Sequence, residues 1–154
     1  MKPVVYYLIV FALSCSMLPC STPSPTSGDQ AKPAPVGDYQ YTGYDKKGTK
    51  IVEGRLSISR VETRRIGNED TIQIKGNWQL NKVGDPERIG AQTGSGDLIG
   101  SIINGELHID LNPNINDGNV ILVGTIEGKR FHGKWSLKGV AGTINEGAFE
   151  ALKK

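Results

Sequence analysis

The strongest constraint on this chain is a two-residue alternation of apolar and polar side chains, which is clearest in residues 71–80. One face of this stretch carries Ile72, Ile74, Gly76, Trp78 and Leu80, and the other carries Thr71, Gln73, Lys75, Asn77 and Gln79. Successive side chains of a β-strand point to opposite faces, so the pattern predicts a half-buried strand. From residue 36 onward no stretch shows the 3.6-residue period and caps of a helix, so we expect none.

The same alternation predicts about eight short strands. They cover residues 38–44, 51–61, 71–80, 97–103, 106–111, 120–126, 130–138 and 143–152. The fourth and fifth meet at Asn104-Gly105, a strong hairpin signal. The fold class is therefore all-β, and we expect a single antiparallel up-and-down barrel, because closing the sheet removes its unpaired edges. A β-sandwich is the alternative.

Glycines interrupt the predicted strands, and two of them stand two residues before a tryptophan. The two segments are Gly76-Asn77-Trp78 and Gly133-Lys134-Trp135. A missing side chain lets a strand bend and lets a neighbouring ring lie over bare backbone. With the strand number and length, these segments resemble the small meander barrels of the calycin type, which include lipocalin-like and avidin-like proteins. The resemblance covers most of residues 37–154 and implies an architecture only.

The N-terminus has the features of an export signal. Lys2 precedes an apolar run over residues 4–13, and Cys15 follows in the setting Ala-Leu-Ser-Cys-Ser. A helix of this length spans about 15 Å, half of a bilayer core, which argues against a membrane-spanning segment. The setting resembles the lipobox of bacterial lipoproteins, in which the cysteine is lipidated and becomes the first mature residue. Plain secretion is the alternative, and Cys20, after Pro19, is the rival lipidation site.

These features divide the chain into three parts. Residues 1–14 are the expected signal peptide, residues 15–36 the lipidated cysteine and a Pro/Ser/Thr-rich tether, and residues 37–154 the barrel domain. The tether has too few apolar side chains to offset the entropy of ordering it. By resemblance, Ser16 directly after the cysteine favours the outer membrane, if the host has one. A secreted or periplasmic location is the alternative.

Charge and cysteine content exclude several classes of protein. After removal of residues 1–14 the chain carries 17 basic and 16 acidic residues, a balance that argues against nucleic acid as a partner. Cys15 and Cys20 are the only cysteines, so no disulfide framework stabilises the domain. The pair Arg64-Arg65 precedes Glu69-Asp70, and we expect it in a solvated loop.

Few residues suggest catalysis or metal binding. His108 and His132 should point outward by alternation, and two ligands without a third make a poor zinc site. The stretch from Asp110 to Gly118 has oxygen-bearing residues at alternate positions but lacks the glycine and glutamate of a calcium loop. Gly94-Ser95-Gly96-Asp97 is expected to be a turn without a following helix, so it cannot cradle a phosphate. We therefore expect no enzymatic activity, no metal site and no cofactor.

The remaining candidates are the aromatic residues Trp78, Trp135 and Phe131. They either pack in the core or line a ligand cavity, because an eight-stranded barrel can hold one small ligand. The first hypothesis is a lipid-anchored, non-enzymatic envelope barrel that binds a small apolar ligand or an envelope protein. One alternative is an inhibitor of an external hydrolase, such as lysozyme or a protease, acting through an exposed loop at residues 92–96. Another is a structural spacer without a ligand.

We predict that Cys15→Ala releases the protein into the soluble fraction and stops its metabolic labelling by fatty acid, because the lipid is attached to that thiol. Fractionation and labelling of cells that express the wild type, Cys15→Ala and Cys20→Ala measure both effects. Labelling that persists in Cys15→Ala and stops in Cys20→Ala would move the lipidation site to Cys20.

Overall fold

The structure is a computed structural model that describes residues 35–66, 69–90 and 92–154. The expected signal peptide, the expected lipidation site Cys15 and most of the expected tether lie outside the described residues. No helix in the described part of the chain is long and apolar enough to cross a membrane.

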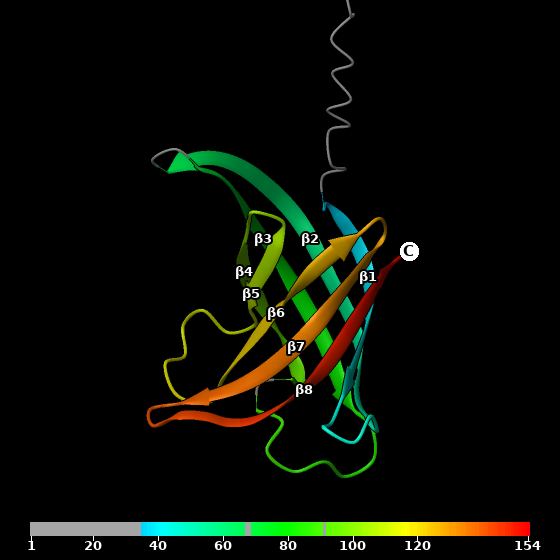
Figure 1. Ribbon diagram of the computed structural model, residues 1–154. Coiled ribbons are helices and arrows are strands. Elements are labelled where there is room, and N and C mark those ends of the chain that lie inside the picture. The colour runs from blue at the N-terminus through cyan, green and yellow to red at the C-terminus, as the bar shows by residue number, and fades with distance from the viewer. Residues whose placement is uncertain (1–34, 67–68, 91) are drawn as a thin grey trace, which may run out of the picture. The chain divides into compact units, whose positions relative to one another are not determined.

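Eight antiparallel strands form one closed barrel in which each strand pairs with its neighbours along the chain (Figure 1). The strands are β1 (Gly37–Tyr44), β2 (Lys50–Ile66), β3 (Glu69–Lys82), β4 (Gly94–Ile103), β5 (Glu106–Asp110), β6 (Asn119–Glu127), β7 (Arg130–Gly139) and β8 (Gly142–Lys153). Pairing of β1 with β8, from Tyr39↔Lys153 to Tyr44↔Ala148, closes the barrel. The predicted up-and-down barrel is confirmed, and the sandwich alternative is wrong.

The predicted hairpin at Asn104-Gly105 is confirmed by its backbone. Asn104 has φ 51° and Gly105 has φ 85°. Two consecutive positive φ angles are what a type I′ turn requires, and this turn matches the twist of the strands that it joins. Asn and Gly are the residues that tolerate this conformation best, so the local sequence determines the turn.

Two local expectations are wrong. The pair Arg64-Arg65 lies within β2, which continues to Ile66 in a long hairpin with β3. The expected turn at residues 94–97 is instead the start of β4, where Gly96 pairs with Trp78. A Cβ atom on Gly96 would lie 3.1 Å from the indole ring, so this glycine lets β4 pass over the tryptophan.

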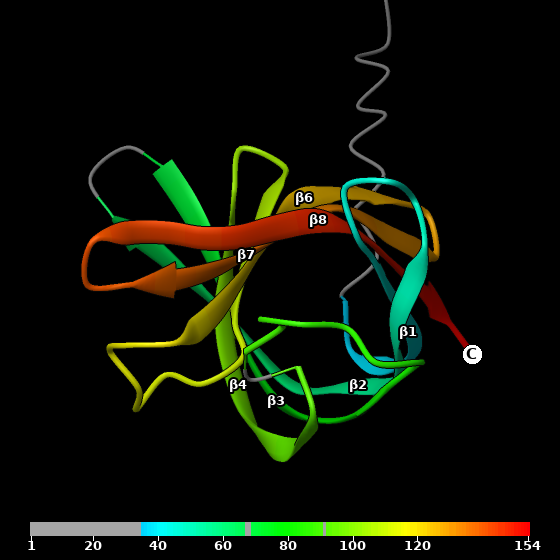
Figure 2. The same ribbon diagram turned by 90° about the horizontal axis from the view of Figure 1, so that it is seen from below.

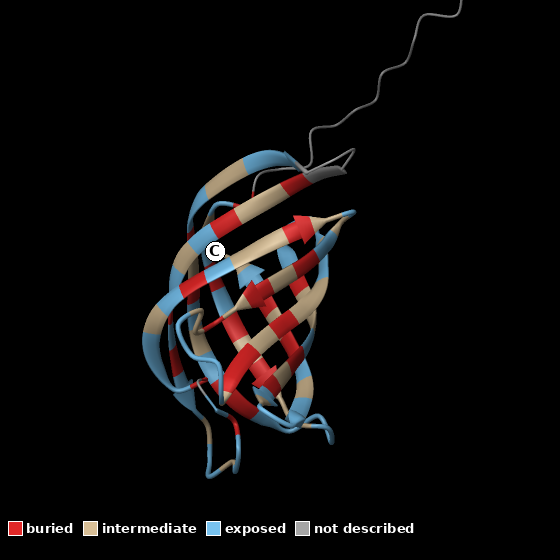
Figure 3. Cartoon of the chain, turned by 90° about the vertical axis from the view of Figure 1, so that its left-hand side faces the viewer, coloured by how far each residue is buried: buried red, intermediate tan, exposed pale blue. Residues whose placement is uncertain are grey.

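Alternation along the strands separates a core from a solvent-exposed wall, as Figure 3 shows by the change of colour along each strand. The inward positions of all eight strands contribute to one hydrophobic cluster. Outward positions carry charged side chains such as Arg55, Lys75 and Lys134.

Close backbone contact between β6 and β7 depends on two facing glycines, Gly124 and Gly133. A Cβ atom on Gly133 would lie 2.1 Å from the Val123 carbonyl oxygen and 2.5 Å from the Gly124 Cα. Both neighbours are backbone atoms, so no side-chain rotation can relieve the overlap. The strands must therefore move apart if either glycine gains a side chain.

We predict that Gly133→Ala lowers the free energy of unfolding by about 3 kcal/mol, because the added methyl group forces β6 and β7 apart. The matched control is Gly128→Ala in the β6–β7 turn, where φ is 58° and nothing lies within 4 Å of an added Cβ atom. Gly128→Ala should lower the free energy of unfolding by about 1 kcal/mol, because alanine is strained at this positive φ angle. Urea unfolding measures both, and equal losses in the two variants would contradict the steric account.

Candidate binding surface on the outer wall

Both tryptophans are buried near one end of the barrel, which we call the long-loop end. It carries the β1–β2, β3–β4, β5–β6 and β7–β8 connections, and Figure 2 looks toward it from below. The Trp78 indole N–H donates a hydrogen bond to the Leu111 carbonyl oxygen. The Trp135 indole N–H donates to the Tyr44 carbonyl oxygen at 2.7 Å. Each indole therefore joins its own strand to the end of another.

The β3–β4 connection closes the long-loop end with a buried amide. Gln92 is fully buried; its Oε1 accepts a hydrogen bond from the Tyr41 hydroxyl at 2.8 Å, and its Nε2 donates to the Ile89 carbonyl oxygen at 3.1 Å. Burial raises the pKa of Tyr41 far above its usual value, so the phenol stays a donor. The expected exposed loop at residues 92–96 is therefore only partly confirmed, since residues 93–95 are exposed, and its inhibitory role stays a prediction. Gln92 is a contact of the core, and residues 94–96 belong to β4.

The opposite end of the barrel, which we call the termini end, carries the start of β1 and the end of β8. There the rings of Tyr39 and Phe131 stack with centroids 4.3 Å apart. The Tyr39 hydroxyl donates a hydrogen bond to the carbonyl oxygen of the buried Pro35 at 2.6 Å. Burial raises the pKa of Tyr39 to about 12.

The three aromatic residues expected to line a ligand cavity are all part of the core. Trp78, Trp135 and Phe131 are at most 3 % exposed. Each is held by a hydrogen bond or by ring stacking within the domain. A ligand would have to displace these contacts in order to reach them. Their role in binding a ligand stays a prediction.

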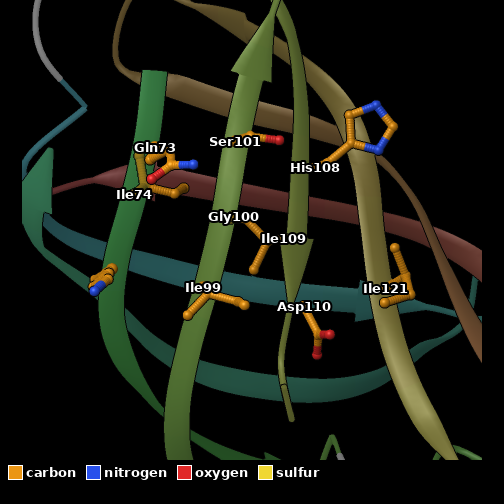
Figure 4. A pocket seen from close by; sticks show the side chains of 10 residues that line it. Gln73, Ile74, Ile99, Gly100, Ser101, His108, Ile109, Asp110 and Ile121 are labelled. Atoms are coloured by element: carbon orange, nitrogen blue, oxygen red, sulfur yellow. The ribbon is translucent and has the colours of Figure 1, made fainter. Parts of the chain in front are cut away.

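The outer wall of the domain contains a depression of about 390 Å³ across β3, β4, β5 and β6 (Figure 4). Strand register places its outward side chains in two rows. The first row runs Lys75, Ile99, Asp110, Ile121, and the second runs Gln73, Ser101, His108. The core residues Ile74 and Ile109, with Gly100 between them in the sheet, also line the depression.

Two isoleucines form the apolar part of this depression. Ile99 is 44 % exposed although it lies in the middle of a strand, and Ile121 is partly exposed. Asp110 stands between them, and its Oδ1 accepts hydrogen bonds from the Asn112 backbone N–H and the Asn119 side-chain amide, both at 2.8 Å. The depression therefore offers two partly exposed isoleucines on either side of a carboxylate held by hydrogen bonds, with polar side chains beside them.

The polar row of the depression contains a serine and a histidine on neighbouring strands. Ser101 and His108 face each other across β4 and β5, yet no hydrogen bond joins them within the described residues. His108 Nε2 lies instead 3.3 Å from Glu106 Oε2. Without an activating hydrogen bond, Ser101 remains an ordinary hydroxyl group.

The two histidines do not form a common metal site. His108 lies on β5 and His132 on β7, with β6 between them. Both side chains are partly exposed, at 43 % and 32 %, as the alternation predicted. Among residues 35–66, 69–90 and 92–154, no group of three or more His, Cys, Asp or Glu side chains could hold a metal ion.

Hydrogen bonds within the loop and to neighbouring residues hold the segment from Asp110 to Gly118 in place. Asp110 Oδ1 accepts from Asn112 and Asn119, and Asp117 Oδ1 accepts from the Val140 backbone N–H at 3.3 Å. The loop is thereby joined to the β7–β8 turn. Side-chain oxygens that accept from nearby backbone N–H groups are common in turns.

Comparison with known proteins finds no match to this chain, either among protein-family models or among curated proteins. The function is therefore inferred from the geometry of the domain and from the signal-like N-terminal sequence.

Proposed function

We propose that this protein is a lipid-anchored β-barrel of the bacterial cell envelope that binds another envelope protein through the depression around Ile99 and Ile121. The exposure of Ile99 and the partial exposure of Ile121, at outward strand positions that line one depression, are the observation that carries this proposal. The protein has no catalytic role in this account.

The proposed location depends on the N-terminal sequence. Lys2, the apolar run over residues 4–13 and the setting of Cys15 support export and lipidation. The Pro-rich segment that follows supports a tether between membrane and barrel, since such chains extend by about 3.1 Å per residue. Multiple acylation at Cys15 would be needed for durable attachment.

A protein fits the depression better than a small apolar ligand does. The outward side chains that line it come from one face of one sheet, so they cannot surround a ligand on several sides. Small-molecule sites usually bury most of the ligand surface. A protein partner needs only a complementary surface with an apolar centre and a polar rim. The interior, which would suit a small ligand, is filled by aromatic side chains.

The inhibitor and spacer hypotheses are less well supported. The segment chosen for an inhibitory loop is buried at Gln92 and continues into β4. A spacer requires no exposed apolar surface, and it gives no reason for Ile99 and Ile121 to face solvent on adjoining parts of the sheet.

We predict that Ile99→Asp abolishes binding of the envelope partner, because a charge would replace the apolar centre of the contact. Tagged wild-type and variant proteins are recovered from cross-linked envelopes, and the protein bound through the wild type is quantified in each sample. Ile99→Asp should lower recovery at least about tenfold, the effect of about 1.4 kcal/mol.

The matched control is Val140→Asp in the β7–β8 turn, which changes a more exposed apolar residue outside the depression. It should leave recovery unchanged, and circular dichroism should show both variants folded. Equal recovery with the wild type and Ile99→Asp would contradict the proposal, and so would a wild-type protein that retains no partner.

A further inference from the structure

β2 extends beyond the strand β1 with which it pairs on one side. Pairing of β1 with β2 ends at Gly37↔Ile58, whereas β2 continues to Ile66 in register with β3. Figure 1 shows this part of β2 running past the start of β1, while β3 beside it stays paired with β4 as far as Thr71. The term "arm" denotes residues 60–66 of β2, which β1 does not reach.

The arm presents a strand edge. From Arg60 onward, β2 pairs only with β3 in the described part of the chain. In an antiparallel strand, every second residue directs its N–H and C=O groups away from a given neighbour. Such groups along an unpaired edge are a template for a further strand.

The described start of the chain does not cover this edge. Pro35 is buried, and its carbonyl oxygen is held by the Tyr39 hydroxyl. Pairing with β2 begins only at Gly37. Proline also lacks the N–H group that a pairing strand would donate.

The charges along the arm complement a second copy of the same arm. Arg60, Glu62 and Arg64 lie on one face of β2, opposite Lys75, Gln73 and Thr71 of β3. Glu62 forms ion pairs with Arg60 and, at 3.6 Å, with Arg64, and both arginine side chains are well exposed. When two such strands pair antiparallel about Thr63, Glu62 of each copy lies opposite Arg64 of the other. A pairing centred on Glu62 would instead place like charges together.

We propose that two copies of this protein associate through the arm, with β2 of one copy pairing antiparallel to β2 of the other about a twofold axis at Thr63. The contact is isologous, so each Glu62–Arg64 pair forms twice. Residues 60–66 lie beyond the β1 pairing, so this register brings the two strands together without displacing β1. None of residues 60–66 lines the depression around Ile99, although Gln73 and Lys75, which do, lie next to Glu62 and Arg60 in the sheet.

Charge reversal tests the register. The full chain with Cys15 and Cys20 replaced by serine should sediment as a monomer–dimer equilibrium. Glu62→Lys and Arg64→Glu should each weaken the dimer at least about tenfold, because each places two pairs of like charges together. The double variant Glu62→Lys/Arg64→Glu should restore the wild-type affinity. A monomer at every concentration would overturn the proposal, and so would a double variant no better than the single ones.

Cysteine cross-linking tests the axis. In the same background, Thr63→Cys should form an intermolecular disulfide on mild oxidation, because the two Thr63 Cα atoms would face each other at about 5 Å. The matched control is Arg55→Cys, an exposed position of β2 that pairs with β1, and it should stay monomeric. A dimer that Arg55→Cys cross-links and Thr63→Cys does not would place the contact elsewhere and overturn the proposal.

Discussion

Pairing of β1 with β8 is the interaction on which the rest of the structure depends. It joins Tyr39–Tyr44 to Ala148–Lys153 and turns a sheet of consecutive hairpins into a closed barrel. Closure gives β1 and β8 partners on both sides and directs one face of every strand into a shared interior. Glycines such as Gly124 and Gly133 make this curvature possible, because their neighbouring backbones come too close for a side chain.

The narrow interior explains why its large side chains act as structure. Tyr39 stacks on Phe131 near the termini end, and Trp78 and Trp135 donate hydrogen bonds to strand ends near the long-loop end. Gln92 then closes the long-loop end by accepting a hydrogen bond from Tyr41. A buried amide whose oxygen and nitrogen both form hydrogen bonds is tolerated in the core, whereas an unpaired one would lower the free energy of unfolding by about 1–3 kcal/mol. The proposed sites for recognition of other molecules are therefore the outer wall and the arm.

Most of the fold could be predicted from the sequence because alternation and turn chemistry are local. The strand from Thr71 to Leu80 and the Asn104-Gly105 turn follow from their own residues. The extension of β2 through Arg64 could not be predicted, because the length of a strand depends on its partner strand. Charged residues also occur both in loops and at exposed strand positions, so the local sequence does not distinguish the two. Burial of Gln92 depends on Tyr41, fifty-one positions away. The exposed Ile99 did carry a signal, since it is an apolar residue at an outward position of a predicted strand.

The central claim is that the barrel interior is filled by its own side chains and that binding takes place outside it. Titration of the folded protein with N-phenylnaphthylamine, an uncharged apolar fluorophore, while the tryptophan emission is followed, tests this claim most directly. The account predicts no saturable binding and unchanged tryptophan emission, because Trp78 and Trp135 are buried and hydrogen-bonded. Saturable binding that quenches this emission, and that Trp78→Phe abolishes in a folded variant, would show an open interior and contradict the account.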